Sequence, residues 1–167
     1  MVELSGEGAI EVLQALGEIP DPEIPVISLV ELGVVRRIDC SQGRVRVELT
    51  PTYSGCPAMH LMEQQVHDKL ADLGYSEIEV RKVYSPAWST DWIDSDAKEK
   101  LRNYGIAPPG PKSLEADLVV FPKESIVQCP YCSSNKTELR SQFGSTSCKS
   151  TYFCKQCIQP FELFKPI

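Results

Sequence analysis

The sequence predicts two structural units, an N-terminal unit in which helices and strands alternate and a small C-terminal β module held together by a metal. Most of the 7 cysteines fall in the last quarter of the 167 residues. Residues 126–167 contain five basic and two acidic residues, a net charge of +3 within a chain of net charge −6. Residues 1–125 therefore carry −9. We place the domains at 1–112 and 126–167, with a connector at 113–125.

The N-terminal unit shows helical and strand periodicity in turn. In GRVRVELT, three apolar residues alternate with charged ones, which is typical of a half-buried strand. Gly17 and Gly74 follow helical patterns and are suited to end them, Gly17 in a left-handed conformation. The expected elements are a helix at 10–16, a β-hairpin at 34–40 and 43–50, a helix from just after Cys56 to Gly74, a strand at 77–84, a helix at 95–105, and a strand or extended strap at 114–122.

The C-terminal unit contains two Cys-x-x-Cys pairs. A segment of roughly 40 residues is too small to be stabilised by an apolar core alone. Two such pairs supply four sulfurs in a tetrahedron, as in a closed structural zinc site. The intervening residues have room for a hairpin from 137–143 to 151–153, which predicts a zinc ribbon. The expected zinc ligands are Cys129, Cys132, Cys154 and Cys157.

Other chemistry is compatible with the same spacing. The cysteines could form two disulfides, although nothing like a secretion signal accompanies them. Four thiolates could also hold a rubredoxin-like iron, but they leave no open position for a catalytic zinc. Cys148 is either a substitute ligand or a buried thiol. His60 and His67 are expected on a helix surface, not among the ligands.

Cys56 is the second candidate site. Pro57 suits the first position of a helix, so Cys56 is expected at or near the N-cap, where the helix dipole favours a thiolate. Gly55 permits an unusual backbone angle and a close approach. Such a thiolate could ligate a metal, accept a cluster or attack an electrophile. The alternative is a half-buried cysteine that happens to precede a helix.

Charge and hydropathy argue against several classes of function. The acidic total is unlike that of a general nucleic-acid or anionic-membrane binder. The C-terminal unit is basic, but most of its aromatic residues are needed for packing. No apolar run approaches the roughly 20 residues of a membrane helix. The N-terminus is acidic, unlike a signal peptide.

Two stretches together resemble the signature motifs of the SufT-like family of iron–sulfur assembly factors. They are DPEIPVISLVELGVVRRI at 21–38 and TPTYSGCPAMHLMEQQV at 50–66. Glu31 is a departure, since many relatives have an Asp before Leu-Gly. The matching positions are Asp21, Glu23, Leu32, Gly33, Thr52, Cys56 and Pro57.

Additional stretches narrow the resemblance. AWSTDWI (87–93), LRNYGIAPP (101–109), FGSTSCKSTYFCKQC (143–157) and PFELFKPI (160–167), with CPYC, are similar to the PaaD (PaaJ) family, accessory subunits of the bacterial phenylacetyl-CoA epoxygenase system. The resemblance implies a cytoplasmic α+β domain, a small mixed sheet with helices on one side. It also implies partnership with a di-iron oxygenase and an iron–sulfur flavoprotein reductase, in maturation or support of their metal centres and without independent catalysis.

The resulting hypothesis is an adaptor that transiently handles iron or an iron–sulfur cluster. Cys56 would supply a thiolate, with Asp21, Glu23 and Thr52 at the same end of the sheet, and the ribbon would dock a partner. One cysteine cannot satisfy the four ligands of a [2Fe–2S] cluster, so a homodimer is expected. The alternatives are a purely structural subunit, an iron-based electron-transfer module and an independent thiol enzyme.

Overall fold

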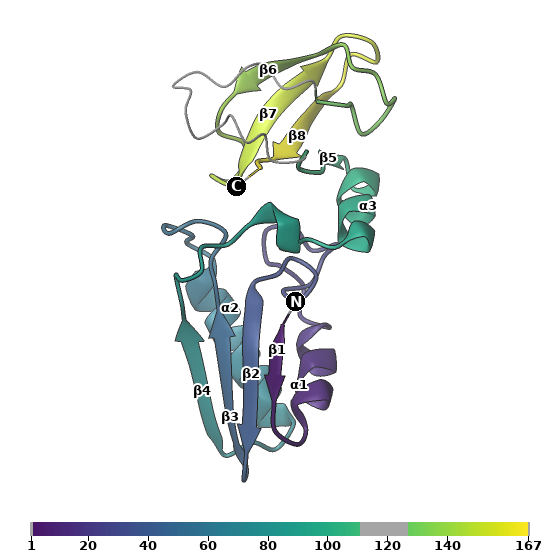
Figure 1. Cartoon of the computed structure of the whole chain (residues 1–167). Helices are drawn as coiled ribbons and strands as arrows, with labels where there is room; N and C mark the ends of the chain where they lie inside the picture. The colour runs from purple at the N-terminus through teal and green to yellow at the C-terminus, as the bar shows by residue number, and fades with distance from the viewer. Residues whose placement is uncertain (1, 111–126, 167) are drawn as a thin grey trace. The chain divides into compact units, whose positions relative to one another are not determined.

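The structure, a computed structural model, describes residues 2–110 and 127–166 (Figure 1). The chain forms two compact units, Met1–Ala97 and Lys98–Ile167. The expected connector at 113–125 and the expected strand at 114–122 lie outside the described residues. None of the described helices is long and apolar enough to span a membrane.

The first unit is built on a mixed four-stranded sheet. The strand order is β1-β2-β3-β4, in which β2 and β3 are antiparallel and the two outer pairs are parallel. The elements are β1 (Glu3–Ser5), α1 (Ala9–Leu16), β2 (Val35–Ser41), β3 (Arg44–Leu49), α2 (Met59–Asp72) and β4 (Glu77–Lys82). This is the α+β arrangement that the sequence predicts, with β1 as an additional strand.

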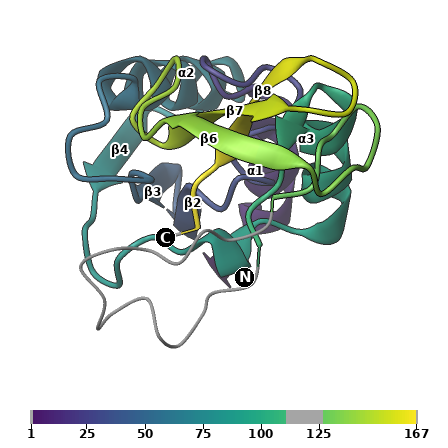
Figure 2. The same cartoon turned by 90° about the horizontal axis from the view of Figure 1, so that it is seen from above.

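Both α1 and α2 cover the same face of this sheet (Figures 1 and 2). Alternation along β3 places Val45, Val47 and Leu49 in the core, each fully buried. From the helices, Leu16 and Leu70 are equally buried. The opposite face of the sheet carries charged side chains, so the sheet has one packed face and one solvent face.

A segment after β4 packs against the chain that enters β2. This segment includes a short 3₁₀ helix, η1 (Thr90–Trp92), and leads into α3 (Ser95–Asn103). The indole Nε1 of Trp88 donates to the carbonyl of Leu32 at 3.1 Å. Gly33 has a φ of +75°, and a Cβ there would lie 2.8 Å from Cβ of Trp92. Gly33 therefore permits both the left-handed backbone and the close approach.

The second unit contains a four-stranded sheet in the order β5-β8-β7-β6. The predicted hairpin is present as β6 (Thr137–Ser141) and β7 (Lys149–Cys154). The strand β8 (Pro160–Phe164) adds antiparallel to β7 and was not expected. A two-residue strand, β5 (Ile106–Ala107), pairs with β8, although it falls in the range that the sequence assigned to the first domain.

Two local expectations are wrong. Gly17 ends α1 with a φ of −65°, in the right-handed region, because the N–H of Glu18 and of Ile19 continue the turn by bonding to preceding carbonyls. The N-cap of α2 is Ala58, so Pro57 does not occupy the first position of the helix, and Cys56 lies near the N-cap, two residues before it. By contrast, Gly74 has the left-handed φ, +89°, expected after α2.

Candidate metal centre and the Cys56 loop

Four cysteines of the second unit converge on one point. The Sγ atoms of Cys129, Cys132, Cys154 and Cys157 all lie within 4.8 Å of one another. Cys129 and Cys157 are 3.7 Å apart at sulfur, and Cys132 and Cys154 are 3.6 Å apart. A tetrahedron with metal–sulfur bonds of about 2.3 Å has edges of about 3.8 Å. The four sulfurs thus form a group of the right size to hold a metal ion.

The two pairs occupy equivalent turns. In the first turn, the N–H of Ser133 donates to the carbonyl of Cys129, and in the second, the N–H of Ile158 donates to that of Cys154, each at 2.9 Å. Ser133 and Ile158 both have a φ of 59°. The second turn also connects β7 to β8, so strand pairing holds the sulfurs in place.

The surroundings set the protonation of these thiols. Burial works to raise the pKa of Cys154, but backbone N–H groups of Cys157 and Gln156 donate to it and lower that pKa to about 6. Burial, together with its thiol neighbours, raises the pKa of Cys157 to about 12. Burial also raises the pKa of Cys129. A metal that binds all four sulfurs must therefore displace protons.

The remaining cysteines lie outside this group. All seven cysteines are within the described residues, and none forms a disulfide. The Sγ of buried Cys148 lies 3.0 Å from Oγ1 of Thr146 and does not join the four-sulfur group. Cys40 is buried on β2, and the hydroxyl of Tyr75 donates to its sulfur at 3.6 Å. The contact with Cys40 raises the pKa of Tyr75 to about 12.

Cys56 lies in the loop between β3 and α2 and is half-buried. Its N–H donates to the carbonyl of Tyr53, and its carbonyl accepts from Met59, so the loop turns twice before the helix begins. Thr52 is buried nearby in sequence. Thr50 is 1% exposed, and its hydroxyl has no hydrogen-bond partner among the described residues.

The first motif lies at the same end of the sheet as this loop. Val35 at the start of β2 pairs with Leu49 at the end of β3, and the N–H of Thr50 donates to the carbonyl of Val34. The segment before β2, which contains Asp21 and Glu23, and the loop that contains Cys56 therefore both leave this end. Figure 1 shows these loops beyond the same ends of β2 and β3.

Asp21 has a structural role in its turn. Its side chain is buried, and Oδ1 accepts the N–H of Glu23 at 2.9 Å and of Ile24 at 2.7 Å. This arrangement, an Asx turn, holds the chain where the two prolines of DPEIP interrupt regular structure. Glu23 is half-buried.

Glu31 and Ser28 form a reciprocal pair that the sequence analysis missed. The N–H of Ser28 donates to Oε2 of Glu31 at 2.9 Å, and the N–H of Glu31 donates to Oγ of Ser28 at 3.2 Å. This is the hydrogen-bond pattern of a capping box, and the Ser-x-x-Glu spacing at 28–31 was its signal. Glu31, in place of the Asp found in many relatives, therefore has a role in this local pair of hydrogen bonds.

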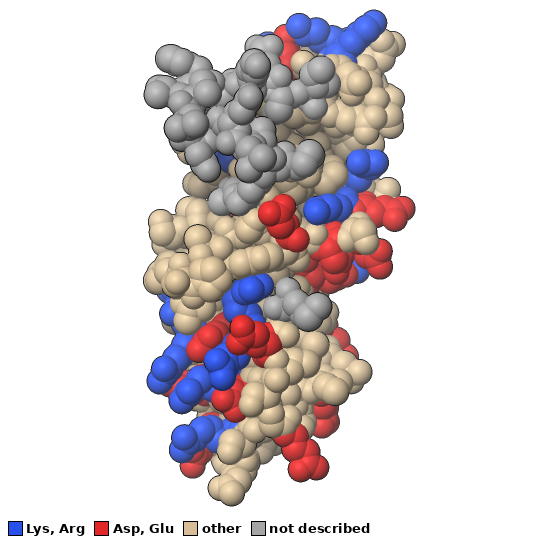
Figure 3. All heavy atoms as spheres, viewed as in Figure 1, with Lys and Arg blue, Asp and Glu red and all other residues tan. Residues whose placement is uncertain are grey.

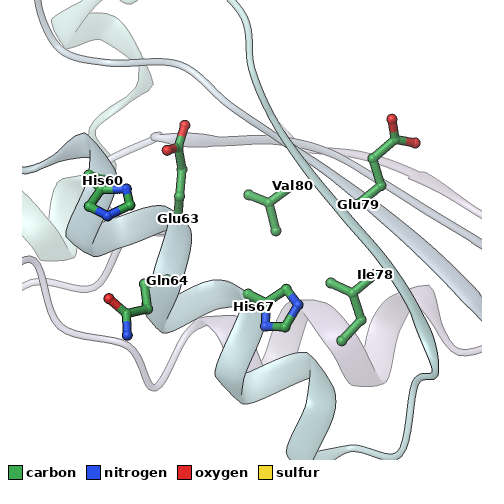
Figure 4. A pocket seen from close by; sticks show the side chains of 7 residues that line it. All are labelled: His60, Glu63, Gln64, His67, Ile78, Glu79 and Val80. Carbon is green, nitrogen blue, oxygen red and sulfur yellow. The ribbon is translucent and has the colours of Figure 1, made fainter.

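A groove elsewhere in the first unit does not include Cys56. It lies between α2 and β4 and is lined in part by His60, His67 and Val80 (Figure 4). Both histidines are on the exposed side of α2, as expected, and belong to no metal-ligand cluster among the described residues.

Two family models match this chain, one over the part that contains Cys56 and one over the part that contains the four clustered cysteines. Residues 10–83 match the family model "Iron-sulfur cluster assembly protein", and residues 117–165 match "PaaD zinc beta ribbon domain". A protein of Escherichia coli (strain K12), named as a putative subunit of 1,2-phenylacetyl-CoA epoxidase, is 44% identical over 94% of this chain and 92% of its own length. The chain belongs to the PaaD family.

Two further relatives each match about half of this chain. The "Fe-S protein maturation auxiliary factor YitW" of Bacillus subtilis (strain 168) is 34% identical over 54% of this chain and 89% of its own length. A crystal structure of a "Domain of Unknown Function DUF59" from Bacillus anthracis covers 55% of this chain and 89% of its own, with 27% identity and a TM-score of 0.52. This chain thus joins a region that matches iron–sulfur cluster assembly proteins to a region that matches the PaaD zinc ribbon.

Proposed function

We propose that this protein is an accessory subunit of the phenylacetyl-CoA epoxygenase system that assists maturation of its iron–sulfur or di-iron centres and has no catalytic activity of its own. The observation that carries the proposal is the union of both domains in one chain, together with 44% identity over 94% of it to a relative named as an epoxidase subunit. Seven cysteines without a disulfide suit a reducing cytoplasm.

The ribbon holds a structural zinc ion on Cys129, Cys132, Cys154 and Cys157. Sulfur separations of 3.6 and 3.7 Å suit tetrahedral zinc. With four protein ligands the site is closed, so it would stabilise the fold and not perform chemistry. In zinc-finger peptides such sites contribute on the order of 10 kcal/mol of folding free energy.

Cys56 provides the functional thiolate in the first domain. Support comes from its half-buried position in a loop that leaves the same end of the sheet as the turn of Asp21 and Glu23. Buried Thr52 belongs to the same loop. Since one thiolate cannot complete a cluster's ligands, any transiently bound iron–sulfur cluster would take its other ligands from a partner or a small thiol.

The ribbon is the docking module for the oxygenase and the iron–sulfur flavoprotein reductase. Support comes from large apolar side chains on its surface: Phe143 is 68% exposed, Ile158 64% and Tyr131 57%. Aromatic side chains are enriched in protein interfaces. Residues 126–167 also carry a net positive charge, which would favour an acidic partner surface.

The thiol role is tested by epoxygenase activity in a reconstituted or whole-cell assay. Cys56→Ala should remain folded and fail to support activity. Asp72→Ala, at the exposed far end of α2, is the control for a substitution in the same domain and should support full activity. Undiminished activity of Cys56→Ala would exclude the thiol mechanism and favour a structural subunit.

Metal analysis with an absorption spectrum on anaerobically purified protein separates the two sites. Wild type and Cys56→Ala should each contain one zinc per chain, whereas iron and sulfide should depend on Cys56. Zinc alone, unchanged in the variant, would argue against cluster handling. Iron in place of zinc, with a coloured and redox-active ribbon, would instead favour electron transfer.

A further inference from the structure

No described strand pairs with the outer edge of β4. β4 is the last strand in its sheet, and among the described strands it pairs only with β3. The N–H of Val83 donates to the carbonyl of Leu49 at 2.8 Å. Because backbone groups alternate along a strand, those of Arg81 and Glu79 face β3 as well. The residues whose N–H and C=O groups face outward are Ile78, Val80 and Lys82.

A groove of about 670 Å³ runs beside this edge, under α2. Figure 4 shows Ile78 and Val80 pointing to the side of the sheet that α2 covers, whereas Glu79 points away. Ile78 and Val80 are only half-buried, unlike the equivalent residues of β3. The edge therefore has both unpaired backbone groups and incompletely covered apolar side chains.

On the opposite face, β3 and β4 place opposite charges side by side. The Nε of Arg46 donates to Oε2 of Glu79 at 2.7 Å. The register places Glu48 of β3 beside Arg81 of β4. Each of these two rows thus has one positive and one negative charge, and the Glu48–Arg81 row has the reverse polarity of the Arg46–Glu79 row. The preceding row, Arg44–Glu77, has the same polarity as Arg46–Glu79. Figure 3 shows basic and acidic side chains intermingled on the lower part of the visible face.

We propose that β4 pairs antiparallel with β4 of a second copy of this chain, about a two-fold axis at Val80. In this register the N–H and C=O of Val80 bond to Val80 of the second copy, and Glu79 faces Arg81 of the second copy. The rows of Arg46–Glu79 and of Glu48–Arg81 then continue with alternating sign across all four strands. The neighbouring register, centred on Glu79, would set Glu79 against itself, which like-charge repulsion disfavours.

The same pairing covers the groove side of the edge. Val80 packs beside Val80 of the second copy. Ile78 lies beside Lys82 of the second copy, and the aliphatic part of that lysine side chain can cover Ile78. The joined sheet has eight strands and leaves only the short β1 at each outer edge.

The geometry separates the two Cys56 loops. β3 and β4 are parallel, and Cys56 follows the end of β3. In an antiparallel β4 pair the two Cys56 loops therefore lie at opposite ends of the joined sheet. This dimer does not bring two Cys56 thiols together on one cluster, so the inference is independent of the proposed function.

Light scattering on the zinc-loaded full chain during gel filtration tests the pairing. Wild type should have twice the chain mass of 18.6 kDa, and its dimer fraction should rise with concentration. Val80→Pro removes an N–H that faces outward, so it should yield monomer while keeping the β3–β4 ladder. Val80→Ala retains the N–H and is the matched control, which should remain dimeric. Fluorescence of the two tryptophans, both in the first unit, checks that each variant is folded.

Charge reversal provides a second test that does not depend on proline. Arg81→Glu places two Glu–Glu contacts in the interface and should raise the dimer dissociation constant by about tenfold or more. Glu79→Lys should have a similar effect. An equimolar mixture of the two variants restores opposite charges at both contacts and should form heterodimers.

Three results would overturn the proposal. The first is a wild-type chain that stays monomeric at every concentration. The second is a dimer that resists both Val80→Pro and Arg81→Glu, which would place its interface elsewhere. The third is failure of the two charge variants to associate when mixed, although both are folded.

Discussion

Glu162→Gln should selectively destabilise the ribbon. The Nζ of Lys149 lies 3.1 Å from Oε2 of Glu162, and the Lys149 side chain is only 4% exposed. Glu162 also accepts the N–H of Ser145 at 2.5 Å. The substitution keeps the size of the side chain but leaves a buried ammonium without its counter-charge.

The expected loss is about 3 kcal/mol. Removal of one partner from a buried ion pair costs roughly 3–5 kcal/mol, and the 25% exposure of the Glu162 side chain argues for the lower end. Such a loss corresponds to about a hundredfold change in the unfolding equilibrium of the ribbon. Glu138→Gln is the matched control. Glu138 pairs with exposed Lys155 and Arg140, and exposed pairs contribute about 0–1 kcal/mol.

The assay is the urea midpoint for zinc release to a coloured chelator. Trp88 and Trp92 are the chain's only tryptophans and lie in the first unit, so their fluorescence serves as an internal control and should not change. A shift for Glu162→Gln no larger than that for Glu138→Gln would show that the buried ion pair does not stabilise the ribbon.

The pH dependence of the stability of the ribbon follows from the same contacts of Glu162. Burial works to raise the pKa of Glu162, but the Ser145 amide and Lys149 outweigh it and hold the pKa below its ordinary value of 4.5. A lowered carboxyl pKa contributes stability above the unfolded pKa, and that stability is lost as the pH falls through the folded value. The difference between wild type and Glu162→Gln should therefore stay constant from neutrality down to near pH 4.5 and shrink only below it.

Three further outcomes are expected. Removal of the metal by a strong chelator should unfold the ribbon and expose its four thiols to a thiol reagent, without a change in tryptophan fluorescence. Ile158→Asn should raise the urea midpoint for zinc release, by about 1 kcal/mol in stability, because a β-branched residue at a φ of 59° is strained; a midpoint at or below wild type would contradict this. Gly33→Ala should lower thermal stability and alter Trp92 fluorescence, whereas Gly43→Ala, where a Cβ would meet nothing within 4 Å, should cost only the backbone strain.

The metal centre was predictable because its chemistry is local. Each Cys-x-x-Cys turn positions two sulfurs by itself, so the spacing already named the four residues that the structure brings together. The longer strands of the first unit were predictable for a similar reason. The alternation of apolar and polar residues over six or seven positions, as in β3, is a property of the segment itself and can be read without knowing what packs against it.

The short strands were not predictable. β1 and β5 have three and two residues, too few for a periodic pattern, and they exist because a neighbouring strand offers an edge. The Ser28–Glu31 pair is different, since its Ser-x-x-Glu signal was present in the sequence and was overlooked. Gly17 does not follow the rule that a glycine after a helix adopts a left-handed φ. Its right-handed φ is set by the hydrogen bonds that Glu18 and Ile19 make to preceding carbonyls.

The amino-acid sequence was sufficient to predict which four cysteines come together, where the longer strands and helices of the first unit lie, and which two modules the chain combines. These features depend on residues that are close to one another in the chain. Two other features come from tertiary packing: Lys149 is buried against Glu162, and β4 is an edge strand that carries both Glu79 and Arg81 on its solvent face. These features depend on register and burial, which arise when segments distant in sequence pack together.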